Sequence, residues 1–196
     1  MGISWANGVL ALVHDVVRSE RLVVAGLRMA ELGNQKLRPD VLGHSIAAKK
    51  FFTAMGIDHT SIDINGKDGA LPIDLREPIA RPDLLGTFDL VTNFGTIEHV
   101  SRQYPAWKNV HDLAKTGGLF LHLVPEVGSW PGHCEFRYDE RFFPALAKLC
   151  AYEVLRHYRH EIDPEHRFVA AVLRKSAAPF PVESEFRAQV PIEGPR

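Results

Sequence analysis

The chain has 196 residues, enough for one domain with a substantial core, and its 45% apolar and 24% charged residues are ordinary for a globular protein. The formal net charge of -1 excludes the basic footprint of a general nucleic-acid binder, so we expect no nucleic-acid partner. Its two cysteines, Cys134 and Cys150, do not make a disulfide framework.

The N-terminal stretch 4–20 carries apolar residues at helical spacing. His14 and Asp15 interrupt it and no basic segment precedes it, so an amphipathic helix is a better interpretation than a signal peptide. No segment is long and apolar enough to cross a bilayer. By elimination we expect a cytoplasmic protein without a membrane partner.

Strands and helices then alternate along the chain. The predicted strands cover 27–33, 58–64, 72–75 (a short strand or an extended turn), 88–93, 119–124, 152–160 and 167–174. The predicted helices after the first cover 45–55, 104–114 and 139–150, and a polar loop covers 34–43. This alternation predicts a largely parallel sheet covered on both faces, while the short turn between the last two strands adds an antiparallel pair.

The predicted fold class is therefore α/β and Rossmann-like. We expect a single domain over 1–175 that begins with a helix within 1–20. The segment 176–196 is rich in proline and lacks periodicity, so we expect a mobile tail or an arm against a partner subunit, which leaves a homodimer open.

Ligands of open α/β sheets bind beyond the carboxyl ends of the strands. The side chains at those ends are mostly small, polar or acidic. As candidate ligand-binding residues they are Glu31, Gly33, Asn34, Gln35, Asp63, Asn65, Asp74, Leu75, Asn93, Phe94 and Gly95.

The order of these strand ends resembles the class I S-adenosylmethionine-dependent methyltransferases over roughly 27–175. The resemblance is carried by Glu31-Leu32-Gly33, by Asp63, by Asp74-Leu75, by the segment 88–100 with its closing Glu98-His99-Val100, and by 115–121. It implies S-adenosylmethionine as cofactor, with Asp63 on the ribose and Asp74-Leu75 beside the adenine. A carboxylate suits the ribose because it can accept hydrogen bonds from both hydroxyls.

The implied activity is methyl transfer to a small-molecule acceptor by a positioned in-line attack, an enzyme of the EC 2.1.1 class. A hydroxyl acceptor would benefit from a base, and His99 and His133 are the candidates. The loop that holds His133, Cys134 and Glu135, with Trp130, Phe136 and Tyr138 close by, is expected to contact the acceptor. The histidines and acids of 157–166 straddle a turn without ligand spacing, so we expect no metal site.

One feature departs from the family. The glycines that usually follow Gly33 are replaced by Asn34-Gln35-Lys36. The alternative function is therefore a non-catalytic methyltransferase-like binding or scaffold protein that has lost its cofactor. An NAD-dependent oxidoreductase is disfavoured because no G-x-G-x-x-G follows the first strand.

Overall fold

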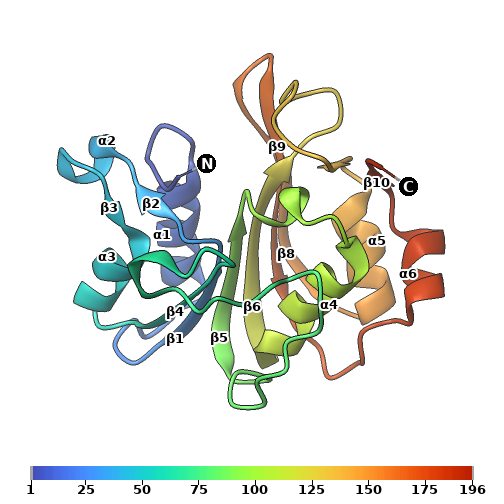
Figure 1. Cartoon of the computed structure of the whole chain (residues 1–196), viewed down its shortest axis with the longest axis horizontal. Coiled ribbons are helices and arrows are strands. Elements are labelled where there is room, and N and C mark those ends of the chain that lie inside the picture. The colour runs from blue at the N-terminus through green and yellow to red at the C-terminus, as the bar shows by residue number, and fades with distance from the viewer. Residues whose placement is uncertain (1, 196) are drawn as a thin grey trace.

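A six-stranded sheet with the order β4-β1-β5-β6-β9-β8 forms the centre of the computed structural model, which describes residues 2–195 (Figure 1). Its strands are β1 (Arg28–Leu32), β4 (Asp58–Ile62), β5 (Phe88–Phe94), β6 (Ala114–Pro125), β8 (Glu153–Asp163) and β9 (His166–Arg174). The first four in space are parallel, whereas β9 runs antiparallel to both β6 and β8. The predicted α/β class, mostly parallel with an antiparallel C-terminal pair, is confirmed.

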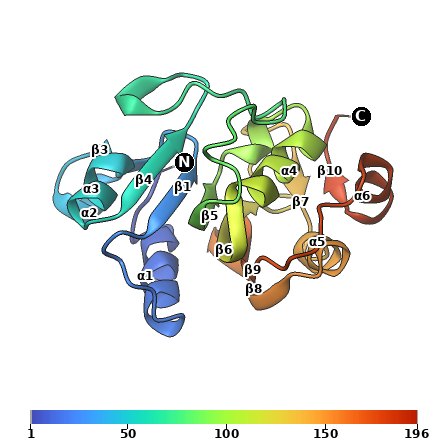
Figure 2. The same ribbon diagram turned by 90° about the horizontal axis from the view of Figure 1, so that it is seen from below.

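Helices cover both faces of the sheet, and Figure 2 shows α1 and α4 on opposite sides. The helices are α1 (Val9–Ser19) and α3 (Ala48–Ala54) on one face, and α4 (Gln103–Leu113) and α5 (Phe142–Cys150) on the other. Alternate strand residues therefore enter different cores. Met29 and Leu90 pack with α1, while Ala30 and Val91 pack with α4, as the two-residue period of a strand requires.

Of the two alternatives predicted for 72–75, a short strand or an extended turn, the structure has the extended turn. Only Leu71 forms a bridge, to Ile62. The Asn109 side chain binds the backbone that follows this bridge. It donates to the carbonyls of Leu75 and Glu77 and accepts from the Ile79 amide. A side chain of α4 thus supplies backbone hydrogen bonds over 75–79 that a neighbouring strand would otherwise provide.

The predicted polar loop at 34–43 also contains regular structure. Strand β2 (Lys36–Leu37) pairs antiparallel with β3 (Ile46–Ala47) around α2 (Pro39–Leu42). Leu37 is fully buried, so the hairpin closes the core beneath it. The following helix is correspondingly shorter than the predicted 45–55.

The C-terminal segment is not the expected mobile tail. Helix α6 (Glu183–Gln189) packs on α4 and α5, and β10 (Ile192–Glu193) pairs with β7 (Arg137–Tyr138). Phe186 is only 2% exposed because its ring lies against Tyr104 and Phe180. The prolines of this segment interrupt any periodic apolar pattern, so the sequence did not predict its helix. Its aromatic residues nevertheless pack in the core.

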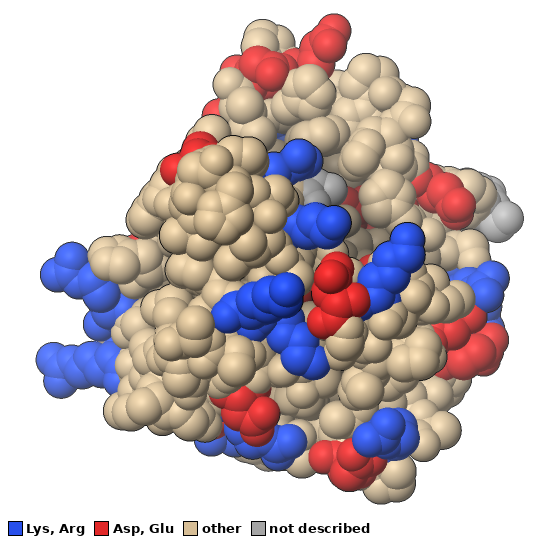
Figure 3. Space-filling view, turned by 60° about the vertical axis from the view of Figure 1, so that its left-hand side comes forward, with Lys and Arg blue, Asp and Glu red and all other residues tan. Residues whose placement is uncertain are grey.

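The surface agrees with the charge composition. Basic and acidic side chains are interspersed on the face drawn in Figure 3. Within residues 2–195, no helix combines the length and the apolar character that a membrane span needs.

Candidate functional site

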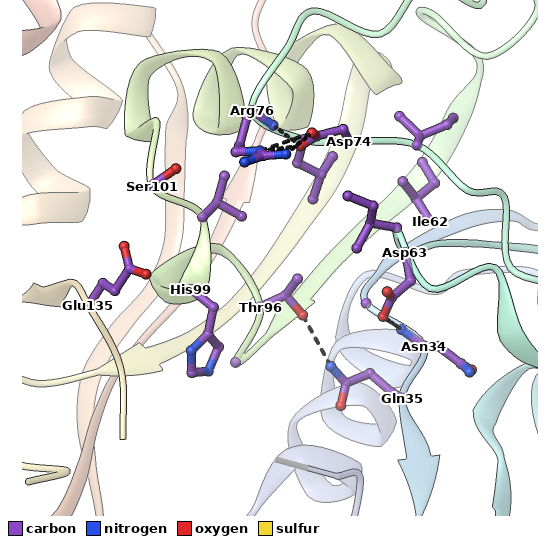
Figure 4. Close-up of a pocket in the computed structure, with 16 residues that line it drawn as sticks. Asn34, Gln35, Ile62, Asp63, Asp74, Arg76, Thr96, His99, Ser101 and Glu135 are labelled. Atoms are coloured by element: carbon purple, nitrogen blue, oxygen red, sulfur yellow. Dashed lines mark hydrogen bonds and ion pairs between the residues drawn. The ribbon is translucent and has the colours of Figure 1, made fainter. Parts of the chain in front are cut away.

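A cavity of about 610 Å³ lies at the carboxyl ends of β1, β4 and β5 (Figure 4). The chain leaves β1 toward β4 on one side and returns to β5 on the other, so this is the switch point where open α/β sheets bind ligands. The predicted residues that line it are Gly33, Asn34, Gln35, Asp63, Asp74, Leu75, Gly95 and His99. The predicted residues that do not are Glu31, Asn65, Asn93, Phe94 and His133.

The exit of β1 is packed tightly against the exit of β5. Thr96 Oγ1 donates to the Leu32 carbonyl at 2.8 Å and accepts from Gln35 Nε2 at 3.2 Å. Gly33 has a φ of +82°, and a β-carbon there would lie 2.4 Å from Thr96 Oγ1. Glycine is therefore required for both backbone conformation and space.

Asn34 and Gln35 follow Gly33 in the loop that is glycine-rich in the resembling family, and both line the cavity. The Gln35 side chain is bonded to Thr96 through its nitrogen only, and its Oε1 is buried without a partner among the described residues. The Asn34 side chain donates to Asp68 of η1 (Lys67–Gly69), while its Oδ1 is likewise buried and unpartnered. The loop thus contains two buried hydrogen-bond acceptors that are unpartnered within residues 2–195.

Asp63 lies at the end of β4 and faces the β1 loop. One carboxylate oxygen accepts from the Asn34 amide at 2.8 Å, and the other accepts from the Asn65 amide at 2.9 Å. Asn65 acts through its backbone and its side chain turns to the Lys67 amide, so it supports Asp63 from outside the cavity. Since a carboxylate has about four acceptor positions, Asp63 keeps capacity for a ligand.

Asp74 is already engaged. Its carboxylate forms a two-point ion pair with Arg76, with a shortest contact of 2.6 Å. This pairing holds the pKa of Asp74 below its usual range. The pair lies at the rim of the cavity, whereas Leu75 is 6% exposed and also packs in the core.

Glu31 lies beneath the cavity and does not line it. Its Oε2 accepts from Ser61 Oγ at 3.1 Å and from the Gln35 amide at 3.4 Å, while Oε1 has no partner in the described chain. Burial raises the pKa of Glu31 to about 8, and burial lowers the pKa of the neighbouring His59 to about 4. Both side chains are therefore neutral at pH 7, and their 3.9 Å approach is not an ion pair.

Hydrogen bonds between the Asn93 side chain and the backbone shape the exit of β5. Asn93 Oδ1 accepts from the amides of Thr96 and Ile97, which turns the chain into η2 (Ile97–His99). Phe94 is fully buried in the core on the α1 side. Of the predicted residues here, only Gly95 lines the cavity, while Asn93 and Phe94 support it from below.

The two candidate bases lie together at the end of the cavity nearest β6. Their imidazole rings meet edge to face with centroids 5.1 Å apart. His99 lines the cavity, whereas His133 does not. Partial burial lowers the pKa of both imidazoles, and each is therefore mostly neutral at pH 7.

The loop after β6 contributes less to the cavity than expected. Glu135 lines it, but Phe136 and Tyr138 are buried in the core, and Trp130 packs against His133, His166 and Phe168. Tyr138 donates to Gln103 at 2.6 Å, so its polar end is satisfied inside the protein.

Several lining residues were missed by sequence reasoning: Ile62, Ile64, Ile73, Arg76, Thr96, Val100 and Ser101. Ile62 and Ile64 flank Asp63, and Val100 and Ser101 follow His99 directly. Proximity to a strand-end polar residue was a usable signal for these four. Arg76 lies two residues after Asp74, so the same signal was present for it, but its ion pair with that carboxylate was not predicted.

No family model and no curated protein matches this chain. Solved structures do match. The Burkholderia thailandensis 1,6-didemethyltoxoflavin-N1-methyltransferase, solved with S-adenosylhomocysteine, superposes with a TM-score of 0.59 at 13% identity, over 85% of this chain and 76% of that one. The N-methyltransferase NodS from Bradyrhizobium japonicum, also with S-adenosylhomocysteine, gives a TM-score of 0.57 at 14% identity over 85% and 84%.

A third match extends the range of chemistry on this fold. The [4+2]-cyclase SpnF superposes with a TM-score of 0.61 at 14% identity, over 89% of this chain and 83% of that one. At such low identities these likenesses concern the fold alone. The chain has the Rossmann-like fold of class I S-adenosylmethionine-dependent methyltransferases.

Proposed function

We propose that this chain is an S-adenosylmethionine-dependent methyltransferase that acts on a small-molecule acceptor. The observation that carries the proposal is the cavity at the switch point between β1 and β5, which joins a carboxylate at the end of β4 to an imidazole after β5. Its volume of about 610 Å³ is within the usual range for small-molecule sites.

The residues that line the cavity fit the cofactor group by group. Asp63 has acceptor positions left for the two ribose hydroxyls. Asn34 and Gln35 line the cavity at the β1 exit, and their amide oxygens, which are buried and unpartnered in the described chain, would suit the ammonium of the methionine part once turned into the cavity. At the adenine end we assign Leu75 and its backbone, since the Asp74 carboxylate is bound by Arg76.

Glu31 acts in this proposal as a support. Its carboxyl holds the Gln35 amide and the Ser61 hydroxyl, so it fixes the β1 loop against β4. Asn93 has the same kind of role at the β5 exit, where it accepts two backbone amides.

The bound cofactor supplies an electrophilic methyl group on a sulfonium. The protein then has to orient the acceptor for an in-line approach, and positioning is worth several orders of magnitude in rate. His99 lines the cavity and is mostly neutral at pH 7, which suits a group that takes up the acceptor's proton. The His133 ring packs edge to face with the His99 imidazole and orients it.

Isothermal titration of the purified chain with S-adenosylhomocysteine and S-adenosylmethionine tests the proposal. We expect saturable binding of both, with NAD as a control that does not bind. No heat and no thermal shift at millimolar ligand would refute the cofactor assignment and favour the non-catalytic alternative.

A further inference from the structure

The charges around the cavity select a class of acceptor. The charged side chains that line it are Asp63, Asp74, Arg76 and Glu135. Arg76 is neutralised by Asp74, and Asp63 faces the β1 loop at the other end. Glu135 is therefore the charge that remains beside His99.

Glu135 is held at this place by the backbone. The amide of Phe136 donates to the Glu98 carbonyl at 3.0 Å, which ties the loop after β6 to η2 and sets Glu135 beside His99. Figure 4 shows both side chains on the same side of the cavity. The Glu135 side chain is exposed at the cavity, and no ion pair or hydrogen bond of its carboxylate is found within residues 2–195, so it is available to a ligand.

Two arginines close in sequence to Ser101 and Glu135 are engaged elsewhere. Arg102 pairs with Glu77, and Arg137 donates to the carbonyls of Ser129 and Trp130. An anionic acceptor, such as a carboxylate or a phosphate, would meet Glu135 without a described cation to offset it.

Resting on the proposed function, we propose that the acceptor is an amine, bound as its ammonium ion by Glu135 and deprotonated by His99. An ammonium group satisfies the unpaired carboxylate and cannot react until it loses a proton. Transfer of that proton to the neutral His99 imidazole is uphill, because an alkylammonium such as that of lysine has a far higher pKa, and the methyl transfer that follows draws it forward.

The methyl transfer needs no reactant besides the ammonium and the bound S-adenosylmethionine. His99 takes one proton from the ammonium, which frees the nitrogen lone pair. The nitrogen then forms a bond to the methyl carbon while the carbon–sulfur bond breaks and leaves its electron pair on sulfur. The product is the methylated ammonium, and His99 releases its proton to solvent.

Matched probes that differ only in charge test this assignment. The protein saturated with S-adenosylhomocysteine would be titrated with benzylamine, benzyl alcohol and benzoate, and in a second series with n-butylamine, n-butanol and butyrate. We expect each amine to bind at least tenfold more tightly than its alcohol and its carboxylate. Equal binding within a series, tighter binding of the carboxylate, or no binding of either amine would overturn the proposal.

Variants of Glu135 locate the effect. Glu135→Gln should weaken amine binding at least fivefold, and Glu135→Lys should reverse the preference toward the carboxylates. Glu140→Gln, at an exposed glutamate outside the cavity, is the matched control and should change nothing. An unchanged amine affinity in Glu135→Gln would also overturn the proposal.

The binding of S-adenosylhomocysteine separates the two proposals. If the wild-type chain does not bind it, the proposed function itself fails. If it binds with equal affinity to wild type and Glu135→Gln while the amines show no preference, only the acceptor assignment fails. Equal affinity also verifies that the variant is folded.

Discussion

The side-chain amide of Gln35 donates to Thr96 Oγ1 across the gap between the exits of β1 and β5, with a distance of 3.2 Å. The same hydroxyl donates to the Leu32 carbonyl, so Thr96 fastens both ends of the β1 turn. In the loop that is glycine-rich in the resembling family, this chain has a side chain, Gln35, that is hydrogen-bonded to the exit of β5. The loop that departs from the family pattern is therefore an ordered one.

Gly33→Ala tests this close packing. We expect a loss of unfolding free energy of about 2–4 kcal/mol, because the new β-carbon meets Thr96 and the backbone has a φ of +82°. Gly117→Ala is the control, since Gly117 has a φ of +81° and open space around it. It should lose only the conformational part, about 1 kcal/mol. Equal losses in urea unfolding would show that the contact with Thr96 is unimportant.

Asp63→Ala tests the proposed ribose contact. The affinity for S-adenosylhomocysteine should fall by about 1.5–3 kcal/mol, measured by isothermal titration, since a charged hydrogen-bond acceptor is lost. Asp83→Ala removes a carboxylate that pairs with Arg81 on an exposed loop, and it should leave the affinity unchanged. A wild-type affinity in Asp63→Ala would remove this residue from the site.

His122→Phe should protect the chain against acid. The imidazole is stacked near Phe120 and Phe143, and burial lowers its pKa from 6.5 to about 3. The unfolded chain therefore takes up this proton first, and stability is lost as the pH falls from 6.5 toward 3. At pH 4.5 the gain from the substitution should be about 2–3 kcal/mol.

Unfolding curves between pH 4 and pH 8 measure this change. The exposed His14, also replaced by phenylalanine, is the control and should leave the acid limb in place. If His122→Phe unfolds at the same pH as the wild type, the imidazole does not limit acid stability.

Glu31→Gln should act at the opposite end of the pH range. Because burial raises the pKa of Glu31 from 4.5 to about 8, its carboxyl stabilises the fold fully below pH 4.5. That contribution is lost as the pH rises from 4.5 through 8, since the unfolded chain releases the proton first. We expect Glu31→Gln to be more stable than the wild type at pH 8.5 by more than about 2 kcal/mol, and to show little gain at pH 4. An equal effect at both pH values would contradict the protonated carboxyl.

Phe186→Ala tests whether the C-terminal segment belongs to the fold. Removal of this buried ring should cost about 3–5 kcal/mol in chemical unfolding. Val182→Ala, at a side chain that is 59% exposed, is the control and should cost well under 1 kcal/mol. A cost below about 1 kcal/mol for Phe186→Ala would mean that the segment does not stabilise the domain.

The local sequence pattern was sufficient to predict the helices and strands whose apolar residues recur at a regular spacing. The apolar strands at 88–93 and 119–124 and the helix at 104–114 were predicted within a few residues, because burial imposes a period on each of them. Strand ends in a parallel sheet meet at one edge, so the order of Gly33, Asp63 and Gly95 was sufficient to place them in one cavity.

Tertiary contacts decided the conformation of the segments that carry no periodic apolar pattern. Asn109 of α4 binds the backbone of 75–79, and Phe186 packs the proline-rich segment onto α4. The sequence by itself determined which residues stand at the strand ends. Only the folded chain decided which of them face the cavity, because a side chain's burial and partners depend on residues distant in sequence. Glu31 and Glu135 illustrate this most clearly: Glu31, expected to line the site, is buried beneath it, whereas Glu135 lines it with a carboxylate that is unpaired within residues 2–195.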